Sequence, residues 1–529
     1  MVRLEEIIRM NPWWAEGIKF ADSDRDLSIL SSKAFKVQRS VPKFTPGNIY
    51  IIKGPRRVGK TVFLKSLILD LLARGAEKLS IFYYSLDSVK NPEELRNMLN
   101  NFFDKPVAGT RYVMLDEVQG VKGWEGVMQA LVNEGMFKNA VVIVTGSLAH
   151  VLRQELMPGR GTEGNTYLMH PLTFNDFCTN LLSIFALHRN GKANTIKDAI
   201  LNLATISANI LKSDYFKIMA ILGDEKLLEN AEGILRALES RISLEEDIES
   251  IYSKLDSIAP YALILKKLFE VYMRTGGYPM SISSYFAVGK LSGYSINPSI
   301  YEELYNYAKS DAATIVGSGR AGNPAFAEIV LKNSLENIGS SISYRKLSNQ
   351  ASMNTKTFIE YLQRLKESYV FITLQGLDND ITPMRLKKVY FSDPFVHYSV
   401  GSIVTGEEPN KYTETVINSY NVGAVVEEII ASHISHIKES EPMLRYETYL
   451  NFLKSKKEID FIYKRNNKTY IGIEVKYQNT VSAKNDLYKI GSINEYLIIS
   501  KDTFEKGKDY AIIPAYLLLA ALQKSDKNL

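Results

Sequence analysis

The segment from Asn48 to Thr61 constrains the fold of this chain more than any other segment. A short apolar stretch, NIYIIK (48–53), runs directly into the loop GPRRVGKT (54–61), and an amphipathic stretch, 62–73, follows at once. A strand, a loop of the form G-x-x-x-x-G-K-T and a helix in this order are typical of the phosphate-binding loop of nucleoside triphosphatases. The chain is therefore expected to bind a nucleoside triphosphate through Gly54, Pro55, Arg56, Arg57, Val58, Gly59, Lys60, Thr61 and Val62.

Each fixed position of this loop has a chemical task. The glycines let backbone N–H groups turn inward on the β- and γ-phosphates, and the helix that begins there points its positive end at them. Lys60 supplies a point charge to the phosphates, and the Thr61 hydroxyl is placed to bind Mg²⁺. A chance match in a glycine-containing loop is the alternative, and the strand and helix on either side argue against it.

A second apolar strand ends in two acids, YVMLDE (112–117). Asp116 is expected to hold Mg²⁺ directly or through water, and Glu117 is expected to polarise the attacking water. A whole strand at 79–85 (LSIFYYS) separates the loop strand from the Asp116 strand. This order is typical of NTPases that insert one strand between the two and carry a glutamate beside the aspartate. A solvated strand end is the alternative interpretation of Glu117.

The next strand, 140–145, ends in Thr145-Gly146-Ser147. A polar residue here can contact the γ-phosphate or the attacking water, so Thr145 and Ser147 are both candidates, although either could instead cap the helix expected near residue 148. Arg160 follows in a glycine-flanked loop. It could reach a neighbouring subunit's γ-phosphate and stabilise transition-state charge, or it could be a surface arginine in a turn.

Several short motifs together resemble one family. They are LDEVQ (115–119), GWE (123–125), TGS (145–147), GR (159–160) and PLTFNDF (171–177), with NPWW (11–14) and GGYP (276–279) as further similarities. The chain resembles the prokaryotic, largely archaeal, AAA-type ATPases whose C-terminal part is similar to a restriction endonuclease. This resemblance implies ATP as the nucleotide, a helical lid and a homo-oligomer, with a hexameric ring among the arrangements. A long helical stretch, about 181–268, departs from the family by matching no motif.

The length of the chain, 529 residues, exceeds that of one ordinary core, so an α/β multidomain protein is expected. Two adjacent tryptophans, Trp13 and Trp14, favour an arm packed on a neighbouring domain or subunit. The expected parts are an N-terminal arm (1–45), a P-loop AAA-type core (46–180), a helical lid or insertion (181–320), a winged helix-turn-helix (321–400) and a PD-(D/E)xK nuclease-like domain (410–529).

Composition indicates the compartment and the kinds of partner that are expected for the protein. A single cysteine, Cys178, excludes an internal disulfide framework and fits a reducing cytoplasm. The apolar run at 511–522 is too short to span a bilayer, so it is expected to be buried and mostly helical, and no membrane partner is expected. The net charge of +5 weakly indicates an anionic partner. His433 and His436 have helical spacing but no third ligand nearby, so they are expected on a helix surface.

The region after residue 323 has the pattern of three helices, 325–338, 344–351 and 354–368, followed by β-like stretches at 370–374 and 389–391. Three helices and a two-stranded wing indicate a winged helix-turn-helix. If the third helix enters the major groove of DNA, the expected contacts are Lys356, Gln363, Arg364 and Lys366. Modules of this kind also serve for packing and dimerisation, so both interpretations stay open.

The last part of the chain carries a second set of acids. Glu427 lies on an amphipathic helix (423–436), Asp460 in a strand (457–463), and Glu474 and Lys476 in another strand (470–477). Alternation along that strand puts Glu474 and Lys476 on one face. The arrangement resembles PD-(D/E)xK nucleases. Asp460 and Glu474 would then hold Mg²⁺, Glu427 would complete the metal site, and Lys476 would orient or deprotonate water.

These two sets of residues lead to three hypotheses. The first is an ATP-driven DNA-processing enzyme, an oligomeric motor whose C-terminal domain cuts or holds DNA. The second is an ATP-dependent oligomerisation switch in defence or mobile-element biology, with the last domain as a scaffold. The third is a DNA-binding ATPase whose nuclease-like domain grips DNA without cutting it.

Overall fold

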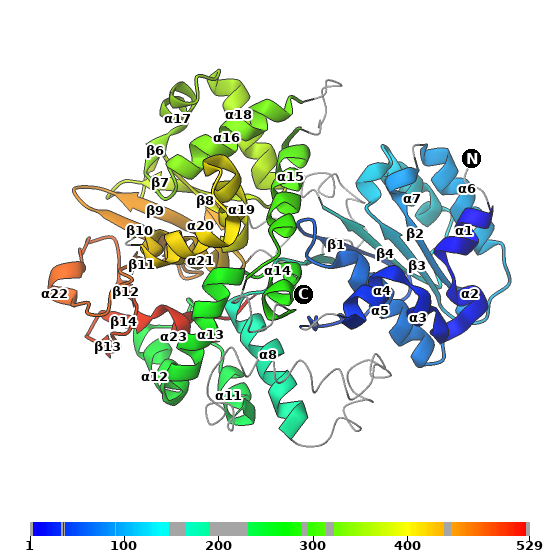
Figure 1. Ribbon diagram of the computed structural model, residues 1–529, viewed down its shortest axis with the longest axis horizontal. Coiled ribbons are helices and arrows are strands. Elements are labelled where there is room, and N and C mark those ends of the chain that lie inside the picture. The colour runs from blue at the N-terminus through cyan, green and yellow to red at the C-terminus, as the bar shows by residue number, and fades with distance from the viewer. Residues whose placement is uncertain are drawn as a thin grey trace.

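Two β-sheets organise the chain. The computed structural model describes residues 4–32, 35, 37–89, 91–147, 165–189, 231–287, 295–313, 322–419, 421–438 and 446–524. Figure 1 shows the two sheets on opposite sides of a group of helices that includes α14 (Pro279–Ala287) and α15 (Pro298–Ala313).

The first sheet has five parallel strands in the order β2-β3-β4-β1-β5. Every residue of its central strand β4 is buried, as is usual for a parallel sheet covered by helices on both faces. The strands and helices of this part are β1 (Asn48–Lys53), α5 (Lys60–Ala73), β2 (Ile81–Ser85), α6 (Pro92–Phe103), β3 (Arg111–Asp116), α7 (Trp124–Asn133), β4 (Ala140–Gly146), β5 (Thr166–Leu168) and α8 (Phe174–Arg189).

The strand that lies between β1 and β3 in this sheet is β4. It pairs with β1 from Asn48↔Val141 to Lys53↔Gly146 on one side, and with β3 on the other. The strand at 79–85, which separates β1 from β3 along the chain, is the edge strand β2. The inserted strand inferred from the sequence is therefore corrected to β4, because a crossover helix can carry the chain past its neighbour in the sheet. This order places Thr145, at the end of β4, between the loop and the two acids.

The N-terminal arm covers the edge strand β2. The side-chain amide of Asn11 donates to Tyr83 O (2.9 Å) and accepts from Tyr83 N (2.7 Å). The indole N–H groups of Trp13 and Trp14 both donate to Ile81 O, at 3.1 and 2.8 Å. The arm thus satisfies backbone groups that an edge strand would leave unpaired. Its α-helices are α1 (Leu4–Met10), α2 (Trp13–Glu16), α3 (Phe20–Ser23) and α4 (Arg25–Ser32).

Helices lead from the first sheet to a second sheet of nine strands, in the order β13-β14-β12-β11-β10-β9-β7-β8-β6. Among the described residues between the two sheets, the α-helices besides α14 and α15 are α11 (Ala231–Leu238), α12 (Ile248–Ile258) and α13 (Ala262–Thr275). The remaining elements are α16 (Pro324–Glu336), β6 (Ile342–Ser343), α17 (Tyr344–Gln350), α18 (Thr355–Glu367), β7 (Phe371–Leu377), β8 (Pro383–Phe391), α19 (Pro394–Thr405), α20 (Pro409–Asn418), α21 (Val422–Ser435), β9 (Leu450–Lys454), β10 (Glu458–Lys464), β11 (Tyr470–Val475), α22 (Ala483–Asp486), β12 (Glu495–Ser500), β13 (Glu505–Lys506), β14 (Tyr510–Pro514) and α23 (Ala515–Ala521).

The second sheet runs across the boundary that the sequence places between residues 400 and 410. Strand β7 pairs in parallel with β9, from Gln375↔Asn451 to Leu377↔Leu453. Strands β7 and β8, expected as a two-stranded wing after three helices, are therefore joined to the strands that carry the C-terminal acids. The order α16-β6-α17-α18-β7-β8 is otherwise the order expected for a winged helix-turn-helix, and β6 pairs with β8.

Helix α21 is buried, and the expectation that His433 and His436 lie on a helix surface is wrong. Their exposed fractions are 5% and 6%. His433 Nε2 accepts a hydrogen bond from Phe174 N (2.8 Å), and burial lowers the pKa of His433 to about 4. His436 stacks on His170 with ring centroids 3.8 Å apart. Helical spacing alone does not distinguish these positions from surface ones, because α21 is apolar on most of its sides.

The C-terminal helix α23 returns to the first part of the chain. Lys524 Nζ lies 2.9 Å from Asp176 Oδ1, and Asn175 Nδ2 donates to Ala520 O. The apolar run at 511–522 is divided between the end of β14 and α23, and Cys178 is buried. Among the described residues, no helix has both the length and the apolar character needed to cross a bilayer.

Candidate functional site

The loop after β1 has the backbone shape that phosphate binding requires. Gly59 has a φ of +99°, and a Cβ at Gly54 would lie 2.0 Å from Met169 O. Helix α5 begins at Lys60, directly behind the loop. The Lys60 side chain is buried, and its ammonium donates to the carbonyl oxygens of Gly54 (3.0 Å) and Pro55 (2.9 Å). The ammonium therefore lies inside the loop, where the motif predicts phosphate oxygens.

Asp116, at the end of β3, accepts hydrogen bonds from three hydroxyls. Its Oδ2 accepts from Thr61 Oγ1 (2.6 Å) and Tyr83 OH (3.1 Å), and its Oδ1 accepts from Thr145 Oγ1. The Thr61 hydroxyl and the Asp116 carboxylate are adjacent oxygen donors of the kind that Mg²⁺ prefers, so these residues fit the ion. Bound there, Mg²⁺ would neutralise charge on the β- and γ-phosphates.

Glu117 is held beside Lys60 in a strained conformation. Its φ is +52°, in the left-handed region that non-glycine residues rarely adopt and that often marks functional sites. Its Oε1 lies 3.6 Å from Lys60 Nζ, and its Oε2 accepts a hydrogen bond from Gln119 Nε2. Burial alone would raise the pKa of Glu117, but the charge of Lys60 and the bond from Gln119 outweigh it and lower the pKa. The carboxylate is therefore ionised at neutral pH and can accept a proton.

Thr145 and Ser147 contact the acids and their neighbours. Besides donating to Asp116, Thr145 Oγ1 accepts from Glu117 N (3.1 Å), so it fixes both acids. Ser147 Oγ accepts from Gln119 Nε2 (3.0 Å). Arg160, expected to reach a neighbouring γ-phosphate, lies outside the described residues.

Sequence reasoning missed three contributors to this site. Tyr83 on β2 donates to Asp116, and no motif signals it. Gln119 orients Glu117 and belongs to the motif LDEVQ, so its position two residues after the acid was an available signal. Asp311 on α15 bonds to Arg56 of the loop across 255 residues of sequence, a separation that no local pattern can bridge.

The structure brings the C-terminal residues together on the neighbouring strands β10 and β11. Asp460 N donates to Glu474 Oε2 (3.1 Å), and Val475 N donates to Asp460 Oδ2 (2.9 Å). Lys476 Nζ lies 3.5 Å from Glu474 Oε1. The pKa of Glu474 is raised to about 8 by burial and by the nearby Asp460. Glu427, on α21, is linked to Asp460 by a lysine that the sequence did not single out.

That residue is Lys388, on β8. Its side chain is 1% exposed, and its ammonium lies 3.0 Å from Glu427 Oε1, 2.8 Å from Glu458 Oε1 and 3.2 Å from Asp460 Oδ1. Within the described ranges, no three His, Cys, Asp or Glu side chains are placed to hold a metal ion. Asp460, one of the two acids expected to bind Mg²⁺, therefore shares a lysine counter-charge with Glu427 and Glu458, whereas Glu474 lies beside Lys476.

The four residues expected to contact DNA on α18 divide into two pairs. Lys356 and Gln363 are exposed. Arg364 Nη1 instead donates to Ala312 O at the end of α15 (3.2 Å), and Lys366 forms an ion pair with Glu447. Arg364 and Lys366 therefore make contacts inside the chain as well, and DNA binding by the four residues stays a prediction.

Comparison with known families identifies the first sheet. Residues 46–178 match the family model described as an AAA domain. The chain therefore contains an AAA-type P-loop ATPase domain, and the predicted α/β ATPase core is confirmed. Residues 266–405 match a model described as a domain of unknown function. This second match includes α15, α18 and Lys388.

Comparison with individual proteins covers less of the chain. An uncharacterised protein of Haemophilus influenzae is 30% identical over 138 residues, which are 24% of this chain and 32% of the relative. An uncharacterised protein of Methanocaldococcus jannaschii is 26% identical over 179 residues, which are 32% of this chain and 38% of the relative. The matched part thus spans about a third of the length of these curated relatives.

Solved structures resemble the chain weakly. The Aeropyrum pernix ORC1 protein in complex with DNA is 12% identical, with a TM-score of 0.28, over 76% of this chain and 93% of that chain. The Thermotoga maritima RuvB Holliday junction branch migration motor is 12% identical, with a TM-score of 0.23, over 70% of this chain and 89% of that chain. At these TM-scores the similarity carries no conclusion about function.

Proposed function

We propose that this chain hydrolyses ATP with Mg²⁺ at the loop of residues 54–61, and that an oligomer of it couples this hydrolysis to DNA bound by the C-terminal half. The observation that carries the proposal is the meeting of Lys60, Thr61, Asp116 and Glu117 at one edge of the first sheet. Lys60 would bind the phosphates, Thr61 and Asp116 would hold Mg²⁺, and Glu117 would take a proton from the attacking water.

The part of the chain proposed to hold DNA is the exposed basic surface of α17, α18 and the β8 strand. Arg345 and Lys346 on α17, Lys356 on α18 and Arg385 on β8 are all exposed. The pairing of Ser343 with Leu386 places Arg385 beside the start of α17. Exposed cations that are close in space attract the phosphate backbone without reading sequence.

Removing charge from this surface is expected to weaken DNA binding. The double variant Lys346→Ala/Lys356→Ala should bind duplex DNA less tightly at low salt, and the slope of log affinity against log salt should fall by about one for each phosphate that the protein no longer neutralises. Fluorescence anisotropy of a labelled duplex at several salt concentrations measures both quantities. Lys138→Ala, which removes an exposed lysine near the start of β4, is the matched control and should bind as the wild type does. Equal affinities and slopes for all three proteins would contradict a DNA-holding role for α17 and α18.

The contacts of Lys388 with three acids favour the hypothesis that the C-terminal acids stabilise the fold and do not cut DNA. Removing one partner from a buried ion network leaves charge uncompensated at a cost of about 3–5 kcal/mol. Lys388→Met is therefore expected to lower the midpoint of thermal unfolding markedly. It should also open the acids to a cation, so Mn²⁺ should raise that midpoint more in Lys388→Met than in the wild type.

Thermal unfolding with and without Mn²⁺ tests this prediction, and a DNA gel accompanies it. The wild type should leave single-stranded, duplex and forked DNA intact with Mg²⁺ or Mn²⁺. Cleavage that disappears in Asp460→Ala would instead establish a nuclease and overturn this interpretation of Lys388.

A further inference from the structure

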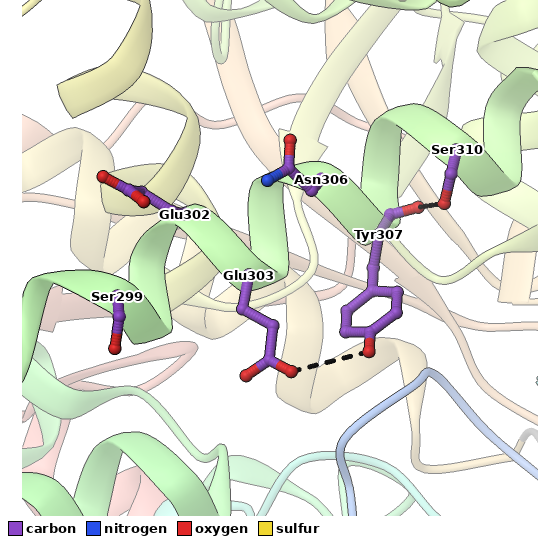
Figure 2. A pocket seen from close by; sticks show the side chains of 6 residues that line it. All are labelled: Ser299, Glu302, Glu303, Asn306, Tyr307 and Ser310. Atoms are coloured by element: carbon purple, nitrogen blue, oxygen red, sulfur yellow. Dashed lines mark hydrogen bonds between the residues drawn. The ribbon is translucent and has the colours of Figure 1, made fainter.

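Two arginines of the phosphate-binding loop contact α15, which lies far along the chain. Arg56 Nε donates to both carboxylate oxygens of Asp311, at 3.0 and 3.2 Å. Arg57 Nη2 donates to Tyr307 OH (3.0 Å) and forms an ion pair with Glu303. Figure 2 shows Glu303 and Tyr307 pointing to the same side of α15, joined by a hydrogen bond. One face of α15 thus contacts the phosphate-binding loop.

The Asp311 contact leaves most of the Arg56 guanidinium available. A guanidinium has five N–H donors, and Asp311 takes the one on Nε. Within the part of the chain that the structure describes, Nη1 and Nη2 of Arg56 make no hydrogen bond. The guanidinium centre also lies 5.4 Å from the centroid of the Tyr307 ring, which supports it from one side. Asp311 therefore orients Arg56 without occupying the nitrogens that could bind a phosphate.

Arg56 belongs to the same loop as Lys60. Arg56 is the second residue after Gly54, so it belongs to the turn that wraps the phosphates. Burial would lower the pKa of Arg56, but Asp311 and Glu117 together raise it. The charge of Asp311 also acts to raise the pKa of Lys60. Arg56, Lys60 and Glu117 therefore share one electrostatic environment.

The burial of Asp311 argues against a purely stabilising role. The residue is 7% exposed, and burial raises its pKa in spite of the charge of Arg56. Removing a carboxylate from water costs free energy. In a buried ion pair the attraction between the two charges seldom exceeds this desolvation cost. Such a pair is better explained by what it positions than by the stability it provides.

We propose that Asp311 is a positioning residue that holds Arg56 with its terminal nitrogens toward the γ-phosphate, so that the same chain supplies the arginine that stabilises the transition state. This assignment rests on the proposed ATP hydrolysis and deepens it. It also gives the matched domain of unknown function a part in the ATPase site. Because Arg364 of α18 bonds to the carbonyl of Ala312, next to Asp311, the proposed DNA-holding helix adjoins the same contact.

The test measures ATP turnover by the full-length chain with substitutions on both sides of the contact. Arg56→Ala is expected to lower kcat by about 10²- to 10³-fold, as for loss of one donor to transition-state charge. Asp311→Asn is expected to lower kcat by about 10- to 100-fold while KM for ATP stays within about threefold, because it loosens a group that contacts the phosphate. Asp311→Glu should recover part of the loss.

The double variant distinguishes a positioning role of Asp311 from two independent effects of the substitutions on the rate. If Asp311 acts through Arg56, Arg56→Ala/Asp311→Asn should be no slower than Arg56→Ala alone. Arg56→Lys, which keeps the charge but loses the forked donors, should behave like Arg56→Ala and carries the test if Asp311→Asn does not fold. Glu302→Gln is the matched control, an exposed acid on the same helix, and should leave kcat unchanged.

The outcomes distinguish the loss of ATP hydrolysis itself from the loss of the positioning role of Asp311. A wild type that does not hydrolyse ATP overturns the proposed function, and the positioning role with it. An active wild type with Asp311→Asn at the same or higher kcat, or with losses that multiply in the double variant, overturns the positioning role alone.

Discussion

The variant Glu117→Gln is expected to bind ATP as the wild type does and to hydrolyse it about 10²- to 10⁴-fold more slowly, the range typical for loss of a general base. The pKa of Glu117 is lowered by Lys60 and Gln119 in spite of burial, so the carboxylate is ionised and can accept a proton from water at neutral pH. An amide of the same shape cannot accept this proton. It retains the volume of the side chain, so the loop and its bound nucleotide should be undisturbed.

Two measurements on the same preparation check this prediction. Binding of a fluorescent ATP analogue reports the affinity, and phosphate release reports turnover. Glu93→Gln removes an exposed acid at the start of α6 in the same domain, and it should match the wild type in both measurements. A Glu117→Gln variant that releases phosphate at the wild-type rate would exclude Glu117 as the base.

The variant Lys60→Ala is expected to lose both affinity and turnover, with kcat/KM reduced by about 10²- to 10³-fold or more. Burial lowers the pKa of Lys60, while Glu117 and Asp116 oppose this shift. Its ammonium already lies inside the loop, bonded to the carbonyls of Gly54 and Pro55, so no large movement is needed to meet phosphate oxygens. Alanine would leave the loop without its central cation.

Titration calorimetry with ATP and phosphate release measure the two losses for Lys60→Ala. Lys65→Ala is a suitable comparison, because Lys65 lies on the same helix but bonds to Asp24 and Asp26 of the arm. It should change stability more than turnover. Unchanged ATP turnover in Lys60→Ala would mean that hydrolysis does not occur at this loop.

The sequence predicted the ATPase site better than the sheet that supports it. The loop and the Asp116–Glu117 pair are local patterns, since each function requires residues within a few positions of each other. Strand order is not local. The structure places β4 between β1 and β3, whereas the chain places β2 between them, because pairing is decided by how the crossovers pack. The polar contacts of Thr145 with both acids follow from that order.

The sequence could not predict contacts between residues that lie far apart along the chain. Asp311 is an ordinary acid in a helical stretch, and nothing near it in sequence indicates a partner at Arg56. Lys388 lies directly before the β-like stretch 389–391, and nothing near it in sequence indicates that it contacts Glu427, Glu458 and Asp460. Four C-terminal residues could be matched to a nuclease pattern, but the lysine that pairs with Glu427 and Asp460 comes from β8, which only the shared sheet brings beside them.

DNA-coupled ATP hydrolysis at the loop of residues 54–61 is tested by the rate of ATP hydrolysis by the purified 529-residue protein, with Mg²⁺ or with EDTA, and with or without duplex DNA. We expect turnover that requires Mg²⁺, rises when DNA is added and is lost in Lys60→Ala. Turnover that persists in EDTA or in Lys60→Ala, or no turnover under any of these conditions, would contradict it.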